Sequence, residues 1–192
     1  MNEKELGNIE KVLDKGYIEV VDVLGDDLTP VNAARVSFGG RSDNFTDKDR
    51  RLSKYLIKHK HFSPFRHVMF RFRIKASEFV MRQMYKHVIG IETTSNDSTK
   101  DHAWNEISGR YKPVNEFYEP TIWRKQSKSS KQASDGVLED TDNEEVCKMF
   151  SECMENIKQT YEKMLEKGVA KEQARIILPL NQYTEVIWTC SA

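Results

Sequence analysis

The sequence of 192 residues lacks most of the features that mark secreted or membrane proteins. Its three cysteines form no CxxC pair, so we expect neither a disulfide framework nor a zinc knuckle. No apolar run approaches the length of a membrane span, and the polar N-terminus does not read as a signal peptide. We therefore expect a soluble, cytoplasmic protein, most simply a single domain over residues 1–192.

A net charge is also lacking, because 30 basic and 30 acidic residues cancel. Bulk charge therefore does not argue for a nucleic acid or a membrane as the partner. The distribution is uneven, however, since basic residues dominate from Lys48 to Lys86 and acidic residues gather from Glu139 to Glu145. The basic segment fits the binding of phosphorylated small molecules, a charged oligomer interface or an ordinary mixed surface.

Hydrophobic patterning predicts both strands and helices. Strands are expected at residues 17–24, which are rich in β-branched side chains, at 68–75, where apolar and polar residues alternate, and at 185–190. Such alternation is typical of an antiparallel strand with one buried face. Apolar residues at helical spacing predict a long amphipathic helix that ends at Gly168, whereas residues 125–142 are expected to form an irregular surface loop.

Several expected helices begin with residues suited to capping. Thr29 precedes a proline, and Ser77 precedes an amphipathic helix that is expected to end near Gly90. Two further starts match the capping-box pattern, and these are Thr46 with Asp49 and Asp142 with Glu145.

The stretch from Glu78 to Tyr111 carries the most chemistry. On a helix, Gln83, Lys86 and His87 share one face, so an amide, an ammonium and an imidazole converge near its end. A polar loop follows, and then the run Asn105–Tyr111, which contains a Ser-Gly-Arg turn. These groups suit an anionic, heteroaromatic ligand such as a nucleotide, although a solvated helix end followed by a surface loop has the same pattern.

Two other segments carry candidate binding groups. Three of the five histidines lie between His59 and His67, without a neighbouring cysteine or acidic residue. A segment beside a cofactor is therefore a better interpretation than a metal site. Arg175 lies among apolar residues, where an unpaired guanidinium is costly, so we expect it to pair with either a structural carboxylate or a phosphate.

Taken together, these segments resemble the flavin-dependent thymidylate synthase family. The matching blocks occur in the family's order within residues 17–192, and they are Ala33–Phe38, His61–His67, Phe79–His87, Asn105–Tyr111, Glu172–Leu180 and Tyr183–Thr189. The resemblance implies an α+β fold in which an antiparallel sheet packs with long helices. It also implies reductive methylation of dUMP to dTMP, with methylenetetrahydrofolate as the one-carbon donor, FAD as the cofactor and NADPH as the reductant.

The resemblance assigns residues to two binding sites. The dUMP site comprises Gln83, Lys86, Glu106, Ser108, Gly109, Arg110 and Arg175. The FAD site comprises Ser37, His61, Ser63, Arg66, Lys86, His87, Asn105 and Glu106. The cations of the dUMP site are expected on the phosphate. Ser108 has no general base next to it in the sequence, so it is expected to donate a hydrogen bond to the phosphate or the base rather than to act as a nucleophile.

The sequence departs from the family pattern in two respects. Lys86-His87-Val88 replaces the usual Arg-His-Arg, which removes one cation and the planar donor geometry of another, and additional residues lie between Gly90 and Trp104. The chain also ends at Ala192, so we expect a C-terminally truncated domain whose catalytic arginine lies beyond that residue. The family assembles as a homotetramer with shared sites, and the same assembly is expected here.

Three functions are compatible with these observations. The first is an active synthase whose C-terminal part is supplied by a separate or spliced segment. The second is a catalytically impaired protein that still binds nucleotide or flavin. The third is a nucleic-acid-binding protein that uses the basic face from Lys48 to Lys75, although the aromatic side chains of Phe70 and Phe72 are placed in the core by the alternation.

Overall fold

The computed structural model describes residues 6–86 and 103–192, and the chain within these ranges divides into two compact units. The sheet unit comprises residues 6–76, 80–86, 103–107 and 184–192, and the helix unit comprises residues 77–79 and 108–183. The chain runs from one unit into the other several times. The expectation of a single domain stays a prediction.

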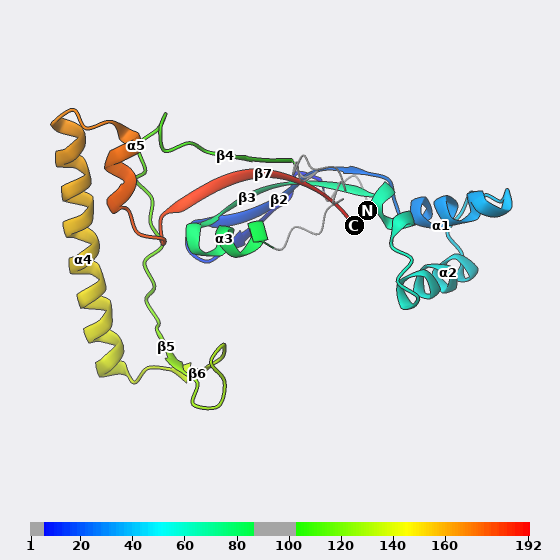
Figure 1. Ribbon diagram of the computed structural model, residues 1–192. Coiled ribbons are helices and arrows are strands. Elements are labelled where there is room, and N and C mark those ends of the chain that lie inside the picture. The colour runs from blue at the N-terminus through cyan, green and yellow to red at the C-terminus, as the bar shows by residue number, and fades with distance from the viewer. Residues whose placement is uncertain (1–5, 87–102) are drawn as a thin grey trace. The chain divides into compact units, whose positions relative to one another are not determined.

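A five-stranded sheet forms the centre of the sheet unit (Figure 1). In spatial order its strands are β1 (Ile9–Val12), β2 (Gly16–Leu24), β3 (Met69–Ser77), β7 (Tyr183–Ser191) and β4 (Ala103–Glu106). The pairs β1–β2, β2–β3 and β4–β7 are antiparallel. The three expected strands are confirmed, whereas β1 and β4 were not expected because both are short and rich in polar residues.

Alternation along β3 decides which face of this sheet is buried. Ile74 lies in the core with Met81 of helix α3 (Glu78–Lys86) and Val186 of β7. Partly buried side chains complete this core, namely Phe72, Ala76, Met84, Trp104 and Trp188. Because side chains alternate with a period of two, the arginines of β3 lie on the opposite face. Met81 is only 2% exposed, so its replacement by alanine is expected to cost about 3 kcal/mol of stability.

A second part of the sheet unit consists of short helices. They are α1 (Leu28–Arg35), η2 (Val36–Phe38), α2 (Asp47–Lys58) and η3 (Ser63–His67), of which η2 and η3 are 3-10 helices. Helix α1 packs against both α2 and η3, and Val31, Leu56 and Pro64 are buried there. The expected capping box of Thr46 with Asp49 is confirmed at the start of α2.

The predicted cap of α1 was wrong. Thr29 lies inside the first turn of the helix, and Asp26 supplies the capping carboxylate. Its Oδ1 accepts the backbone N–H groups of Leu28 and Thr29 at 2.9 and 3.0 Å, and the Thr29 hydroxyl accepts the N–H of Asp26 at 3.0 Å. A carboxylate is a strong acceptor at a helix N-terminus, where unpaired N–H groups and the helix dipole favour negative charge.

The helix unit is dominated by α4 (Asp140–Glu166), followed by α5 (Lys171–Ala174) and the 3-10 helix η4 (Arg175–Ile177) (Figure 1). The expected long helix is confirmed, and Gly168 beyond its end has a φ of +81°, which favours glycine. The buried hydrophobic side chains of this unit are Phe117, Met154, Tyr161, Ala174 and Tyr183.

Two more caps and one loop differ from the sequence predictions. The buried Ser77 hydroxyl has no hydrogen-bond partner among the described residues, and the first N–H groups of α3 instead donate to the carbonyls of Gln182 and Leu180 at 2.9 and 3.0 Å. Helix α4 begins before Asp142, so that carboxylate lies in its first turn rather than at the cap. The polar segment expected to be irregular contains a small antiparallel pair, β5 (Arg124–Gln126) and β6 (Ser134–Val137).

Candidate functional site

Three residues of the predicted dUMP site lie in the turn after β4, which belongs to the helix unit. The backbone N–H of Tyr111 donates to the Ser108 carbonyl at 3.0 Å, which closes the turn. The Ser108 hydroxyl oxygen accepts from the backbone N–H and from Nε of Arg110 at 3.3 and 3.4 Å. Since the hydroxyl is used here as an acceptor, its proton remains available to a ligand.

Arg175 approaches the same turn from η4. A Cβ built on Gly109 would lie 3.4 Å from Cδ of Arg175 and 3.7 Å from its Nη1. Lys171 of α5 also reaches the turn, where its Nζ donates to the Tyr111 carbonyl at 3.0 Å. The structure thus brings Arg175 next to a turn from which the sequence separates it, and that turn holds three other residues of the predicted dUMP site, Ser108, Gly109 and Arg110.

The charges of this cluster are not neutralised by the helix unit itself. Arg110 lies over the ring of Tyr111, 5.4 Å from its centroid, and forms no ion pair with a described carboxylate. Arg175 is exposed and likewise has no acidic partner within residues 6–86 and 103–192. The expected apolar setting of Arg175 was wrong, because Ile176 points to solvent with 79% of its surface exposed. Two exposed guanidinium groups beside a glycine are suited to bind an anion.

The remaining predicted dUMP residues lie in the sheet unit. Gln83 and Lys86 are exposed on α3, one turn apart. Glu106 ends β4, and its Oε1 accepts a hydrogen bond from the Thr184 hydroxyl at 2.6 Å. Trp104 Nε1 donates to the other carboxylate oxygen at 3.4 Å. Sequence reasoning missed Thr184, which lies far from Glu106 along the chain.

The predicted FAD residues are distributed along the surface of the sheet unit. Ser37 lies in η2, and His61, Ser63 and Arg66 lie at or within η3, which packs against α1. All four are exposed. Lys86 is exposed at the end of α3 and Asn105 is exposed within β4, whereas His87, together with Val88 and the segment up to His102, lies outside the described residues.

A buried ion pair fixes the segment that carries Ser37. Arg35 Nη1 lies 2.5 Å from Oδ1 of Asp49, a side chain that is almost fully buried. Hydrogen bonds from the Thr46 hydroxyl and backbone, and from Arg35, hold the pKa of Asp49 well below its usual range, although burial acts in the opposite direction. Ser42 also donates to Asp49, at 3.2 Å. The capping box was visible in the sequence, but this wider network was not.

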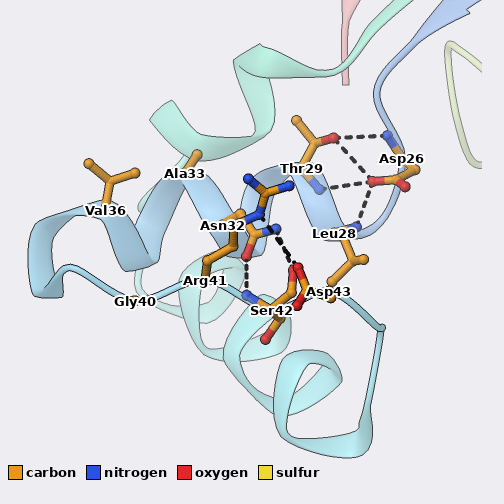
Figure 2. A pocket seen from close by; sticks show the side chains of 10 residues that line it. All are labelled: Asp26, Leu28, Thr29, Asn32, Ala33, Val36, Gly40, Arg41, Ser42 and Asp43. Atoms are coloured by element: carbon orange, nitrogen blue, oxygen red, sulfur yellow. Dashed lines mark hydrogen bonds and ion pairs between the residues drawn. The ribbon is translucent and has the colours of Figure 1, made fainter.

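Beside this network lies an open hollow of about 550 Å³ (Figure 2). Figure 2 shows Asn32 and Ser42 of its lining joined by hydrogen bonds, in which Asn32 donates to the Ser42 carbonyl at 2.9 Å and accepts from the Ser42 N–H at 2.8 Å. Arg41 and Asp43 pair at 3.6 Å in solvent. None of the predicted site residues lines this hollow, and several of its polar side chains already pair with one another. We therefore assign no ligand to it.

A second charged cluster lies on the face of the sheet opposite the core. Arg73 Nε donates to Glu185 at 2.7 Å, and this contact raises the pKa of Arg73. Burial raises the pKa of Tyr17 to about 12, and its hydrogen bond to Glu185 acts in the same direction. Burial opposes ionisation of Glu185, but the hydrogen bonds from Arg73 and Tyr17 lower its pKa overall. The charges of Arg73 and Glu185 thus neutralise each other within the fold.

Other kinds of site have little support in the part of the chain that the structure describes. Within residues 6–86 and 103–192, no group of three or more His, Cys, Asp or Glu side chains is placed to hold a metal ion. No described helix is long and apolar enough to cross a lipid bilayer.

Known proteins resemble the chain over most of its length. The pattern of the family described as thymidylate synthase complementing protein (Thy1) matches residues 19–192. The flavin-dependent thymidylate synthase of Thermus thermophilus is 44% identical over 178 residues, which is 92% of this chain and 60% of the relative. That of Kosmotoga olearia is 42% identical over 183 residues, covering 95% of this chain and 74% of the relative.

A solved structure agrees with these matches. The UMP/dUMP methylase PolB from Streptomyces cacaoi, bound with 5-Br dUMP, superposes with a TM-score of 0.75 at 29% sequence identity. The match covers 92% of this chain and 73% of the solved one. The α+β fold is therefore shared, while the chain spans 60% of the length of the Thermus thermophilus relative.

Proposed function

Since the chain belongs to the thymidylate synthase complementing protein family, we propose that it acts in the flavin-dependent methylation of dUMP to dTMP. The observation that carries this proposal is the cluster of Arg110 and Arg175 around Gly109. It is a site for an anion, formed by two segments distant in the sequence, and it coincides with the residues that the family resemblance assigns to the nucleotide.

The chemistry of the cluster fits a nucleoside monophosphate. A phosphate dianion accepts two parallel hydrogen bonds from a planar guanidinium group. Such a contact combines electrostatic attraction with a defined hydrogen-bond geometry. Ser108 adds a hydroxyl donor, and Gly109 has no side chain to occupy the space beside Arg175. We assign the phosphate of dUMP to this cluster of the helix unit. Gln83, Lys86 and Glu106 of the sheet unit stay candidates for binding dUMP from the family resemblance.

The residues of the FAD set fit an anionic dinucleotide. Ser37 and Ser63 offer hydroxyl groups, and His61 and Arg66 offer N–H donors, all on the exposed surface near α1 and η3. These residues, with Lys86, His87, Asn105 and Glu106, would bind and orient FAD. The bound flavin would supply the hydride that completes the methyl group, with methylenetetrahydrofolate and NADPH as co-substrates.

A homotetramer is part of the proposal. Val36 and Phe38, which flank Ser37, are 74% and 91% exposed, and apolar side chains this exposed are suited to contact a second subunit. The nucleic-acid alternative has less support, because two arginines of the basic segment are already paired. Arg71 lies 3.3 Å from Asp22, and Arg73 lies 2.7 Å from Glu185.

The visible spectrum of the purified chain, with and without FAD and dUMP, tests the proposal first. We expect a retained flavin band that changes when dUMP is added, because the nucleotide and the flavin share residues. A turnover assay with methylenetetrahydrofolate and NADPH then tests the reaction. A colourless protein that also fails to bind dUMP in titration calorimetry would overturn the proposal.

A further inference from the structure

We propose that Thr184 is a positioning residue that sets the orientation of the Glu106 carboxylate toward the nucleoside part of the substrate. This inference rests on the proposed function and deepens it, because it names the group that Glu106 recognises. Thr184 belongs to neither predicted binding set, and its role is inferred from the contacts between β4 and β7.

The Thr184 hydroxyl is held in a single environment. The residue is 5% exposed, and its Oγ1 donates to Oε1 of Glu106 at 2.6 Å. A hydrogen bond of this length to a carboxylate is of the strong, charge-assisted kind. Because threonine is β-branched, few rotamers are open to it, so the hydroxyl is placed before any ligand arrives.

The strand pairing keeps the two residues in register. Glu106 pairs opposite Val186, and the N–H of Ile107 donates to the Glu185 carbonyl at 2.9 Å. Thr184 lies two residues from Val186 along β7, so its side chain is on the same face as that of Glu106. The carboxylate is thus attached to a rigid sheet edge, although Glu106 itself is exposed.

These contacts restrict what Glu106 binds. Thr184 donates to Oε1 and Trp104 donates to Oε2, so both oxygens are oriented and each keeps a further lone pair. An ionised carboxylate accepts hydrogen bonds only, and it repels a phosphate. Its partner on the substrate is therefore a donor, namely an N–H of the pyrimidine or a hydroxyl of the sugar, rather than the phosphate.

Titration of dUMP in the presence of FAD, followed by calorimetry, tests the inference with matched variants. Thr184→Val keeps the shape but removes the donor, and we expect about tenfold weaker dUMP binding. Thr184→Ser keeps the hydroxyl and is expected to stay within about twofold of the wild type. Thr189→Val, which removes a hydroxyl from the opposite face of β7, is the control and should bind normally.

A double-mutant cycle separates positioning from general damage. With Glu106→Gln in the background, Thr184→Val should have little further effect, because the oriented carboxylate is already gone. Inorganic phosphate, used as a second ligand, should bind equally to wild type and Thr184→Val. If Thr184→Val does not fold, Thr184→Ala takes its place with the same expectation.

The outcomes distinguish this inference from the proposed function. A wild-type chain that binds no dUMP overturns both. A wild type that binds dUMP, with Thr184→Val binding equally well or with serine failing to restore affinity, overturns the positioning role alone. Additive losses in the cycle also contradict it.

Discussion

The arginines of the two units have different partners. In the sheet unit, Arg35 pairs with Asp49 at 2.5 Å and Arg73 with Glu185 at 2.7 Å. In the helix unit, Arg175 approaches Gly109, Arg110 follows that glycine in the same turn, and neither arginine has a described carboxylate beside it. A guanidinium that already satisfies a carboxylate adds little attraction for a ligand, whereas an unpaired one retains its donors and its charge. The comparison therefore separates arginines that hold the fold from arginines that we propose to bind an anion.

The largest expected effect is a loss of thermal stability when the ion pair of Arg35 with Asp49 is broken. Asp49→Asn removes the charge that Arg35, Thr46 and Ser42 surround, and it leaves a guanidinium without its counter-charge. Breaking a buried pair from one side is strongly destabilising, so we expect the melting temperature to fall by about 10 °C. Circular dichroism on heating measures the change. The exposed carboxylate of Asp43 provides the control, and an equal loss in Asp43→Asn would contradict the structural role of Asp49.

The opposite behaviour is expected of Arg175. Arg175→Met should weaken dUMP binding about a hundredfold, since a charge-assisted bidentate contact to phosphate is lost. Its melting temperature should stay close to that of the wild type, because the side chain is exposed and has no described acidic partner. Arg124→Met, an exposed arginine of the same unit, is the matched control. Unchanged affinity in Arg175→Met would remove the main support for the phosphate assignment.

A smaller effect is expected from Gly109→Ala. The added methyl group would meet Arg175 and Val114 at 3.4 to 3.6 Å, which is ordinary contact, so the fold should tolerate it. It would occupy space beside the guanidinium, and we expect dUMP binding to weaken about tenfold. Parallel melting curves and titrations measure the two effects. Gly40→Ala, which adds a methyl group 3.8 Å from Arg35, should alter neither, and a stability loss confined to Gly109→Ala would point to a structural glycine instead.

The smallest effect concerns the paired cluster on the sheet, and it depends on pH. The pKa of Tyr17 is raised to about 12, above its value near 10 in an unfolded chain. The folded state therefore keeps the phenol proton longer, and this contribution is full below about pH 10 and declines as the pH rises toward 12. Tyr17→Phe should flatten this alkaline decline, which denaturant unfolding at pH 8 and pH 11 measures. An identical alkaline decline in wild type and variant would contradict the raised pKa.

Local patterns in the sequence predicted some elements well and others poorly. The capping box of Thr46 with Asp49 is confirmed because both partners lie within one helical turn. The caps predicted at Thr29 and Ser77 were wrong, because Asp26 and two distant carbonyls satisfy those N–H groups instead. A helix is capped by whichever acceptor the fold places within hydrogen-bond distance of its first N–H groups. When that acceptor comes from a distant segment, no local sequence pattern reveals it.

In the candidate site, too, some features were predicted from local sequence and others depend on the fold. The Ser-Gly-Arg turn was visible as a motif, and the family resemblance added Arg175 to it. The proximity of Arg175 to Gly109, the bond of Thr184 to Glu106 and the pair of Arg35 with Asp49 appear only in the folded chain. The assignment of site residues to dUMP and FAD stays a prediction until ligand binding is measured.

The sequence by itself determined the alternating strand β3, the long helix α4 and the order of the family's motifs, because each depends on backbone period or on neighbouring residues. Tertiary structure alone decided which charges are neutralised and which remain for a ligand. Pairing of Arg35 or Arg73 requires a carboxylate brought near by packing, and packing depends on the whole chain rather than on any one segment.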